Sequence, residues 1–220
     1  MSIHNTEMQI QIDDVYACPG HCPGCALSSL ERKGYEPDVS LDTLHLIYVK
    51  LNDYLKEIKM ANIYGTRGND IINGTYFNDI IDGGSGADTM AGGIGDDGYF
   101  VDNSGDRVVE VISGGIDTVH ATVSFTLTDE NVENIGLYGN AYTAKGNKLN
   151  NSVSGNQVDN YLYGMEGSDY LSGWGGNDTL DGGLGADTLT GGTGKDVFKF
   201  NTLADSGLTK TTLDVITDFL

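Results

Sequence analysis

Basic side chains are scarce in this chain. Its 12 Lys and Arg residues stand against 32 Asp and Glu residues, and the formal net charge is −20. So acidic a chain is repelled by nucleic acid and by anionic membrane surfaces, and we expect neither as a partner. No apolar run is long enough for a transmembrane helix. The N-terminus also lacks the basic segment and apolar stretch of a secretory signal peptide. These absences fit a cytosolic protein and also a protein that is exported without such a leader.

Motifs of common hydrolases are absent as well. None of the four histidines (His4, His21, His45 and His120) belongs to an H-E-x-x-H zinc motif. There is no G-x-S-x-G nucleophile elbow. Carboxylates are plentiful, but no pair stands apart as a general acid and base. We therefore expect a protein that is not an enzyme.

A repeat of nine residues is the main feature that the chain does have. From Gly146 to Lys199 it reads GNKLNNSVS, GNQVDNYLY, GMEGSDYLS, GWGGNDTLD, GGLGADTLT, GGTGKDVFK. A shorter block from Gly65 to Phe100 reads GTRGNDIIN, GTYFNDIID, GGSGADTMA, GGIGDDGYF. Every unit begins with Gly, its sixth residue is Asp or Asn, and its eighth is apolar or aromatic.

These residue types suit a calcium-binding turn followed by a short strand. Glycine permits positive φ and a tight turn, which aims backbone carbonyls inward, and the sixth-position Asp adds a carboxylate oxygen. Calcium takes six to eight oxygen ligands of both kinds. The last three residues of each unit predict a strand whose middle residue points inward. The predicted inward residues are Ile72, Ile81, Met90, Tyr99, Val153, Leu162, Leu171, Leu180, Leu189 and Phe198.

The period and residue types resemble the hemolysin-type, or RTX, nonapeptide G-G-x-G-x-D-x-U-x, where U is a large apolar residue. This resemblance implies an all-β fold, a parallel β-roll in which calcium stabilises the solenoid. Two units close one coil, so loops eighteen residues apart stack on the same edge. A Gly/Asp-rich flexible linker, or a solenoid that needs no metal, is the alternative.

The resemblance also implies a ligand pattern. Positions two, four and six of one loop meet positions one, three and six of the loop eighteen residues later, with Asp acting through its side chain and the others through carbonyls. The implied calcium ligands are Thr66, Gly68, Asp70 with Gly83, Ser85, Asp88; Asp79 with Asp97; Met165, Gly167, Asp169 with Gly182, Leu184, Asp187; and Trp174, Gly176, Asp178 with Gly191, Thr193, Asp196. The pairs Asn151–Asp169 and Asn160–Asp178 have one neutral partner and should bind more weakly.

Calcium binding would change the charge balance of the chain. About six Ca²⁺ ions would bring about +12, so we expect the repeats to fold only with calcium. Because the full Asp units come last in the second block, folding should start near Asp169–Asp196. RTX-like proteins generally leave Gram-negative bacteria through type I secretion machinery, which implies a secreted, extracellular protein.

The remaining segments divide the chain further. We expect an N-terminal segment at 1–60, RTX blocks at 61–100 and 146–200, a β-strand spacer at 101–145 that continues the solenoid, and the start of a C-terminal cap at 201–220. A separate small β-domain is the alternative for the spacer. Its run NVENIGLYGN (131–140) resembles spacers between RTX blocks. The tail resembles the start of the C-terminal region of serralysin-type peptidases, where a further strand usually follows. The chain could therefore be the non-catalytic part of a larger RTX toxin or hydrolase.

The N-terminal segment has a different character. Its cysteines Cys18, Cys22 and Cys25 form C-x₃-C-x₂-C, which resembles the cluster motif of radical S-adenosylmethionine enzymes. That resemblance implies a [4Fe–4S] cluster with S-adenosylmethionine, a truncated enzyme fused to an acidic repeat tail, and a cytoplasmic location. A zinc site with His21, or no metal, are the alternatives. The apolar spacing at Leu41–Ile58 predicts a helix, so this segment should contain α-structure.

Overall fold

The described part of the protein, residues 60–202, 205 and 213–218 of a computed structural model, is all-β. The predicted fold class, a parallel β-roll, is confirmed for these residues. The strands are β1 (Asn62–Tyr64), β2 (Ile71–Asn73), β3 (Ile80–Asp82), β4 (Thr89–Ala91), β5 (Gly98–Val101), β6 (Arg107–Val109), β7 (Thr118–Ala121), β8 (Phe125–Thr126), β9 (Asn134–Leu137), β10 (Thr143–Lys145), β11 (Ser152–Ser154), β12 (Tyr161–Glu166), β13 (Tyr170–Ser172), β14 (Thr179–Leu184), β15 (Thr188–Thr190), β16 (Val197–Lys199) and β17 (Val215–Ile216).

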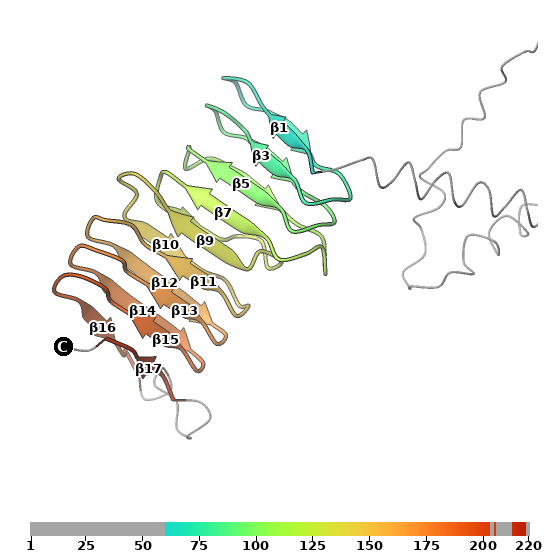
Figure 1. The fold of residues 1–220 in the computed structure, drawn as a ribbon. Coiled ribbons are helices and arrows are strands. Elements are labelled where there is room, and N and C mark those ends of the chain that lie inside the picture. The colour runs from blue at the N-terminus through green and yellow to red at the C-terminus, as the bar shows by residue number, and fades with distance from the viewer. Residues whose placement is uncertain (1–59, 203–204, 206–212, 219–220) are drawn as a thin grey trace, which may run out of the picture. The chain divides into compact units, whose positions relative to one another are not determined.

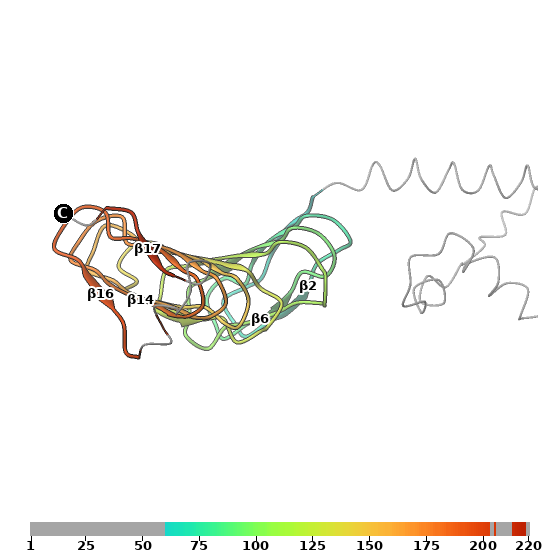
Figure 2. The same ribbon diagram turned by 90° about the horizontal axis from the view of Figure 1, so that it is seen from below.

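The strands stack as successive coils of one solenoid. Odd-numbered strands β1 to β15, followed by β17, form a nine-stranded sheet in the order of the sequence, as the progression of colour in Figure 1 shows. The opposite face holds a three-stranded sheet, β2-β4-β6, and a five-stranded sheet, β8-β10-β12-β14-β16. All pairings are parallel. Figure 2, a view turned by 90°, separates β14 and β16 from β17 on the other layer.

The register follows from the repeat. Within each block, residues eighteen apart are neighbours: Ile63 pairs with Ile81, and Leu171 pairs with Leu189. Two nonapeptides therefore complete one coil, as predicted. A strand of three residues can bury only its middle side chain, which is why one apolar position in nine is enough to build the interior.

The core is one cluster of buried apolar side chains between the two layers, and these middle residues belong to it. Nine of the ten predicted inward residues are buried, from Ile72 to Leu189. The tenth, Phe198, is half-buried and packs against the same cluster. It lies in β16, the last strand of its sheet among the described residues.

The spacer sustains one face of the solenoid and interrupts the other. Strands β7 and β9 continue the nine-stranded sheet, because β5 pairs with β7 and β9 pairs with β11. On the opposite face β6 ends one sheet and β8 begins another. Between β7 and β8 the chain bends at residues 122–123, and β8 lies in the opposite layer.

Within the described residues no helix is long and apolar enough to cross a membrane. The helix predicted at Leu41–Ile58 lies outside the described residues.

Candidate calcium sites in the stacked loops

The loops between strands adopt the backbone that their glycines predict. Position two of the repeat has positive φ at Gly84, Gly93, Gly183 and Gly192, and position four has it at Gly86, Gly95, Gly167, Gly176, Gly185 and Gly194. Six units have another residue at position two, and in two of them Met165 (φ 89°) and Trp174 (φ 72°) still take the left-handed conformation. Residues other than glycine rarely adopt this backbone conformation. Packing against the neighbouring coils therefore imposes it on Met165 and Trp174.

The sixth-position carboxylates form a column along the edge that precedes the nine-stranded sheet. The backbone N–H of Asp79 donates to Oδ1 of Asp97 (2.6 Å), and that of Asp169 donates to Oδ1 of Asp187 (2.8 Å). A backbone N–H to side-chain oxygen bond of this kind links all successive members but one pair. The column contains Asp79, Asp97, Asp117, Glu133, Asn151, Asp169, Asp187 and Asp214. Between Glu133 and Asn151 the link is reversed: the Asn151 side-chain amide donates to the Glu133 carbonyl (3.0 Å).

A second column follows the other edge in two pieces. Asp70 donates through its backbone N–H to Asp88 (2.8 Å), and Asp88 donates to Asp106 (3.0 Å). After the spacer, Asn160 donates to Asp178 (2.7 Å) and Asp178 to Asp196 (2.9 Å). All four predicted Asp–Asp pairs are therefore brought together, although their role as ligands stays a prediction.

One oxygen of many column carboxylates is left without a partner. The Oδ2 atoms of Asp88, Asp97, Asp117, Asp169, Asp178, Asp187 and Asp214 are buried and accept no hydrogen bond. Asp169, Asp178 and Asp187 are each at most 3% exposed. A buried carboxylate oxygen without a donor is costly, and a bound cation is the usual remedy. These residues therefore fit calcium.

Burial shifts the acidity of these groups. Desolvation raises the pKa of Asp169 to about 7, and the nearby Asp187 carboxylate adds to the shift. The pKa of Asp178 and of Asp187 rises to about 6 for the same first reason. Backbone N–H donors oppose the rise in each case without cancelling it. A divalent ion at Oδ2 would favour the ionised form and remove the penalty.

Backbone carbonyls of one loop are directed at the next loop. A Cβ atom on Gly84 would collide with the Thr66 carbonyl oxygen, and one on Gly86 would collide with that of Gly68. The same contacts join Met165 with Gly183 and Trp174 with Gly192. Positions two and four therefore present oxygens to the stacked loop, as the predicted pattern requires. The Oδ2 atoms of Asp88, Asp187 and Asp196 lie close to the position-one glycines Gly83, Gly182 and Gly191.

For the position-three residues, in contrast, no contact of the described residues places their carbonyls near the aspartate Oδ2 atoms. Leu184 is about half exposed, and Ser85 and Thr193 are also exposed. Their carbonyls remain predicted ligands, although the Leu184 carbonyl accepts from the backbone N–H of Gly167 (2.9 Å) and the Thr193 carbonyl from that of Gly176 (3.0 Å).

Units with threonine at position two satisfy their carboxylate differently. Oδ2 of Asp70 accepts from the backbone N–H (2.6 Å) and the hydroxyl (2.8 Å) of Thr66. Oδ2 of Asp79 accepts from the backbone N–H of Thr75 (2.6 Å). Of the four predicted pairs, Asp169–Asp187 is the one in which both residues keep a buried, unpartnered Oδ2.

Asparagine at position six places an amide N–H₂ donor where aspartate has its second carboxylate oxygen. The Asn151 amide donates to the carbonyl oxygens of Val132 (3.3 Å) and Glu133 (3.0 Å), and the Asn160 amide donates to that of Ala141 (3.3 Å). An amide N–H₂ bound to carbonyls occupies acceptors that calcium would use. This supplies a physical reason for the weaker binding predicted at both Asn pairs.

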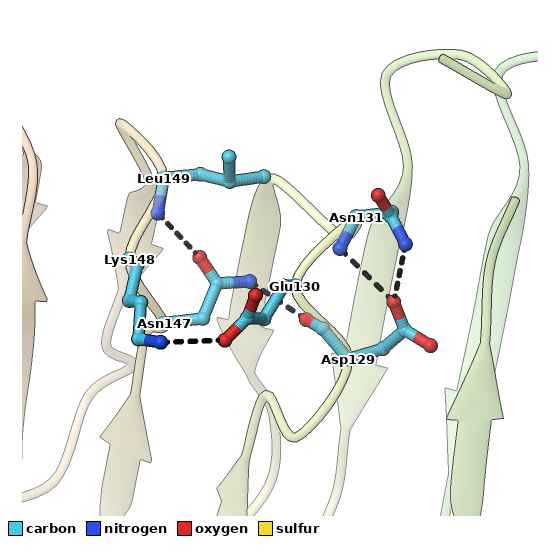
Figure 3. A network of polar contacts seen from close by, with 6 residues as sticks. All are labelled: Asp129, Glu130, Asn131, Asn147, Lys148 and Leu149. Atoms are coloured by element: carbon cyan, nitrogen blue, oxygen red, sulfur yellow. Dashed lines mark hydrogen bonds and ion pairs between the residues drawn. The ribbon is translucent and has the colours of Figure 1, made fainter. Parts of the chain in front are cut away.

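A neighbouring Asn strengthens the same junction between spacer and second block. Asn147 donates through Nδ2 to the Asp129 carbonyl (2.8 Å) and accepts through Oδ1 from the Leu149 N–H (2.8 Å), as Figure 3 shows. The Lys148–Glu130 ion pair in the same view is exposed on the surface. This junction is held by hydrogen bonds rather than by carboxylates.

Four column residues are missing from the predicted ligands: Asp106, Asp117, Glu133 and Asp214. The Asp residues carry a recognisable signal, because each is followed two residues later by an apolar residue (Val108, Val119 and Ile216). The glycine turn before them is altered or displaced: Asp117 lies twenty residues after Asp97, and Asp214 lies 27 residues after Asp187. Glu133 has no such signal in the nonapeptide register.

The cysteine motif, Cys18, Cys22 and Cys25, lies outside the described residues. Its iron–sulfur, S-adenosylmethionine and zinc predictions gain no support, since the family matches below all fall in the repeat region.

Comparison with protein families matches the RTX calcium-binding nonapeptide repeat in four copies, at residues 64–99, 146–180, 154–189 and 175–199. Comparison with curated proteins finds no match. The matched residues are the two blocks of stacked loops, and the spacer between them is unmatched. Residues 64–99 and 146–199 are therefore RTX calcium-binding nonapeptide repeats that lie in a parallel β-roll, which supports a calcium-binding repeat module.

Proposed function

We propose that this RTX module folds when it binds calcium outside the cell, as part of a protein exported by type I secretion. Its role is structural rather than catalytic. The observation that carries the proposal is the column of buried carboxylates, in which one oxygen accepts from the backbone of the preceding coil and the other oxygen is in many cases unpartnered.

Electrostatics supply the physical reason. Asp169, Asp187 and Asp214 follow one another in the column, and the coulombic effect of each neighbour raises the pKa of the residue before it, in addition to burial. At neutral pH these groups repel one another in a water-poor interior. Extracellular calcium modules bind with Kd values of about 10⁻⁴–10⁻³ M. Such sites would be empty in a calcium-poor cytosol and filled outside.

Export is consistent with the same energetics. A chain that stays unfolded before calcium binding can be threaded through a narrow secretion channel, and calcium would then trap it in the folded state. The charge of −20 favours the unfolded form until ions neutralise it.

The test is a calcium titration of the full chain followed by far-UV circular dichroism, with magnesium in parallel. We expect β-sheet signal to appear cooperatively at roughly 10⁻⁴–10⁻³ M calcium and not with magnesium, which demands a tighter octahedral site. Full β-sheet signal in the metal-free protein at neutral pH would contradict the proposal.

A pair of matched variants locates the effect in the column. Asp178→Asn keeps the Oδ1 acceptor for Asn160 and removes charge at the buried Oδ2. Asp159→Asn removes the same charge at an exposed residue whose oxygen accepts from Asn177. We expect the first to raise the calcium midpoint roughly tenfold and the second to leave it nearly unchanged. Equal shifts would mean that overall charge, not the column, governs folding.

A further inference from the structure

Three buried carboxylates converge where the first block meets the spacer. Asp97, Glu110 and Asp117 each place one oxygen within 4.8 Å of the others. They are 2%, 6% and 0% exposed. They come from three different segments: the loop before β5, the residue after β6 and the loop before β7. This cluster lies mostly beyond the residues matched by the first repeat copy, which ends at residue 99.

Glu110 takes the place of a position-one glycine, because it lies eighteen residues after Gly92 and Ala91 pairs with Val109 just before them. It begins the loop that joins β6 to β7 and contains Asp117, so it lies on the same edge as Asp97 and Asp117. There Oε1 accepts from the hydroxyl of the buried Tyr99, and Oε2 accepts from the backbone N–H groups of Gly93 (3.4 Å) and Val111 (3.2 Å). These contacts fix the carboxylate beside the two aspartates.

The two aspartates keep oxygens free for a ligand. Oδ1 of Asp97 and Oδ1 of Asp117 accept from the coil before them, whereas both Oδ2 atoms are buried without a partner. The charged groups that act on the three carboxylates are themselves acidic, namely Asp79, Asp96 and Glu133. No cation of the described residues offsets them in these interactions.

The spacing suits calcium. With Ca–O distances of about 2.4 Å, ligands on opposite sides of the ion lie about 4.8 Å apart. Three oxygens within that span can therefore surround one ion. The Gly93 carbonyl oxygen lies near Gly114, at 2.6 Å from a Cβ built on it, on the same edge.

We propose that Asp97, Glu110 and Asp117 hold one calcium ion at a three-carboxylate site that binds more tightly than the two-aspartate sites of the repeats. The proposal rests on the calcium chemistry of the proposed function, and the site shares Asp97 with the predicted Asp79–Asp97 pair. Affinity in calcium sites rises with the number of charged ligands and with rigidity, and this cluster has the larger charge. The ion would join the first block to the spacer.

The experiment is calorimetric calcium titration of the full chain, comparing Glu110→Gln with Glu130→Gln. Glu130 is the matched control, because it carries the same charge but is exposed and paired with Lys148. We expect one ion to bind at least roughly tenfold tighter than the rest. Glu110→Gln should abolish that tight class and leave the weaker sites, and Glu130→Gln should leave both. An unchanged tight class in Glu110→Gln overturns the proposal.

Terbium luminescence keeps the test valid if Glu110→Gln does not fold. Terbium substitutes for calcium and is excited through a nearby tyrosine, and here the Tyr99 hydroxyl donates to Glu110. We expect Tyr99→Phe to remove most of the luminescence of the first equivalent bound. Undiminished luminescence of that equivalent overturns the site. Absence of calcium binding by the wild-type chain would instead refute the proposed function.

Discussion

Without calcium, the roll should lose stability as the pH rises from about 5 to about 7.5. The groups responsible are the buried column carboxylates. Burial raises the pKa of Asp97 to about 6 and of Asp117 to about 7, and nearby acidic groups add to both shifts. Asp169, Asp178 and Asp187 rise to between about 6 and about 7 for the same reason.

The sign follows from proton linkage. In the unfolded chain these aspartates lose their protons near 3.8, whereas the folded protein retains them to higher pH. The folded state therefore binds more protons between these values, and stability falls as pH rises through about 6 to 7. This contribution to the stability is fully present below about pH 3.8, where the aspartates are protonated in both states.

The magnitude is large enough to decide whether the protein folds. One pKa unit corresponds to about 1.4 kcal/mol. Loop relaxation and water entry will reduce the shifts, so we count a single unit for each of the five aspartates, which gives about 7 kcal/mol. A folded domain has a total stability of about 5–15 kcal/mol. Ionising the column without a metal therefore removes about half of that stability or more.

The assay is urea unfolding of metal-free protein, followed by circular dichroism at several pH values. Calcium should be removed by dialysis, because chelators weaken in acid. In metal-free buffer we expect the urea midpoint to fall as the pH rises, until near neutral pH no folded protein remains to unfold. In excess calcium we expect the midpoint to rise with pH, since protons then compete with the ion. Sedimentation at each pH controls for aggregation. A metal-free midpoint that is flat or rises between about pH 5 and about pH 7.5 would refute the reasoning.

Two further predictions concern single residues. Met165→Gly should stabilise the calcium-bound roll by about 0.5–1 kcal/mol, because the side chain holds a φ of 89° that suits glycine. Leu184→Gly, at a residue that is also 48% exposed and has no positive φ, should not stabilise it in the same unfolding assay, and a gain there would remove strain as the explanation. Asp187→Ala should raise the calcium midpoint of folding more than Asn151→Ala, because Asp187 has an unpartnered buried oxygen while Asn151 already donates to carbonyls. Equal midpoints in a calcium titration would contradict that difference.

Much of this fold could be predicted because the repeat is strictly local. A nine-residue unit specifies its own turn, its own strand and the one residue that enters the core. Buried Ile81, Leu171 and Leu189 required no information about distant parts of the chain. The register also followed, since stacking equal units leaves only the eighteen-residue offset.

The spacer and the tail could not be predicted in the same way. Asp117 and Asp214 reach their places in the column through longer segments, so counting from the preceding unit does not find them. Their short signal, an Asp two residues before an apolar residue, is too common in a chain with 32 acidic residues to identify them. Glu110 required the structure, because only the stacked loops show that a Glu in the place of a position-one glycine lies beside Asp97 and Asp117.

The two edges of the roll differ in how they can transmit calcium binding. The column beside the nine-stranded sheet links every coil by a hydrogen bond, from the N–H of Ala61 to Asp79 at one end to that of Asp187 to Asp214 at the other. The opposite face is divided between β6 and β8. In solenoids, coupling passes between neighbouring units. We therefore expect ions at the unbroken edge to stabilise both blocks together and ions at the divided edge to act within one block, so that the nine-stranded sheet would make the roll a single cooperative unit.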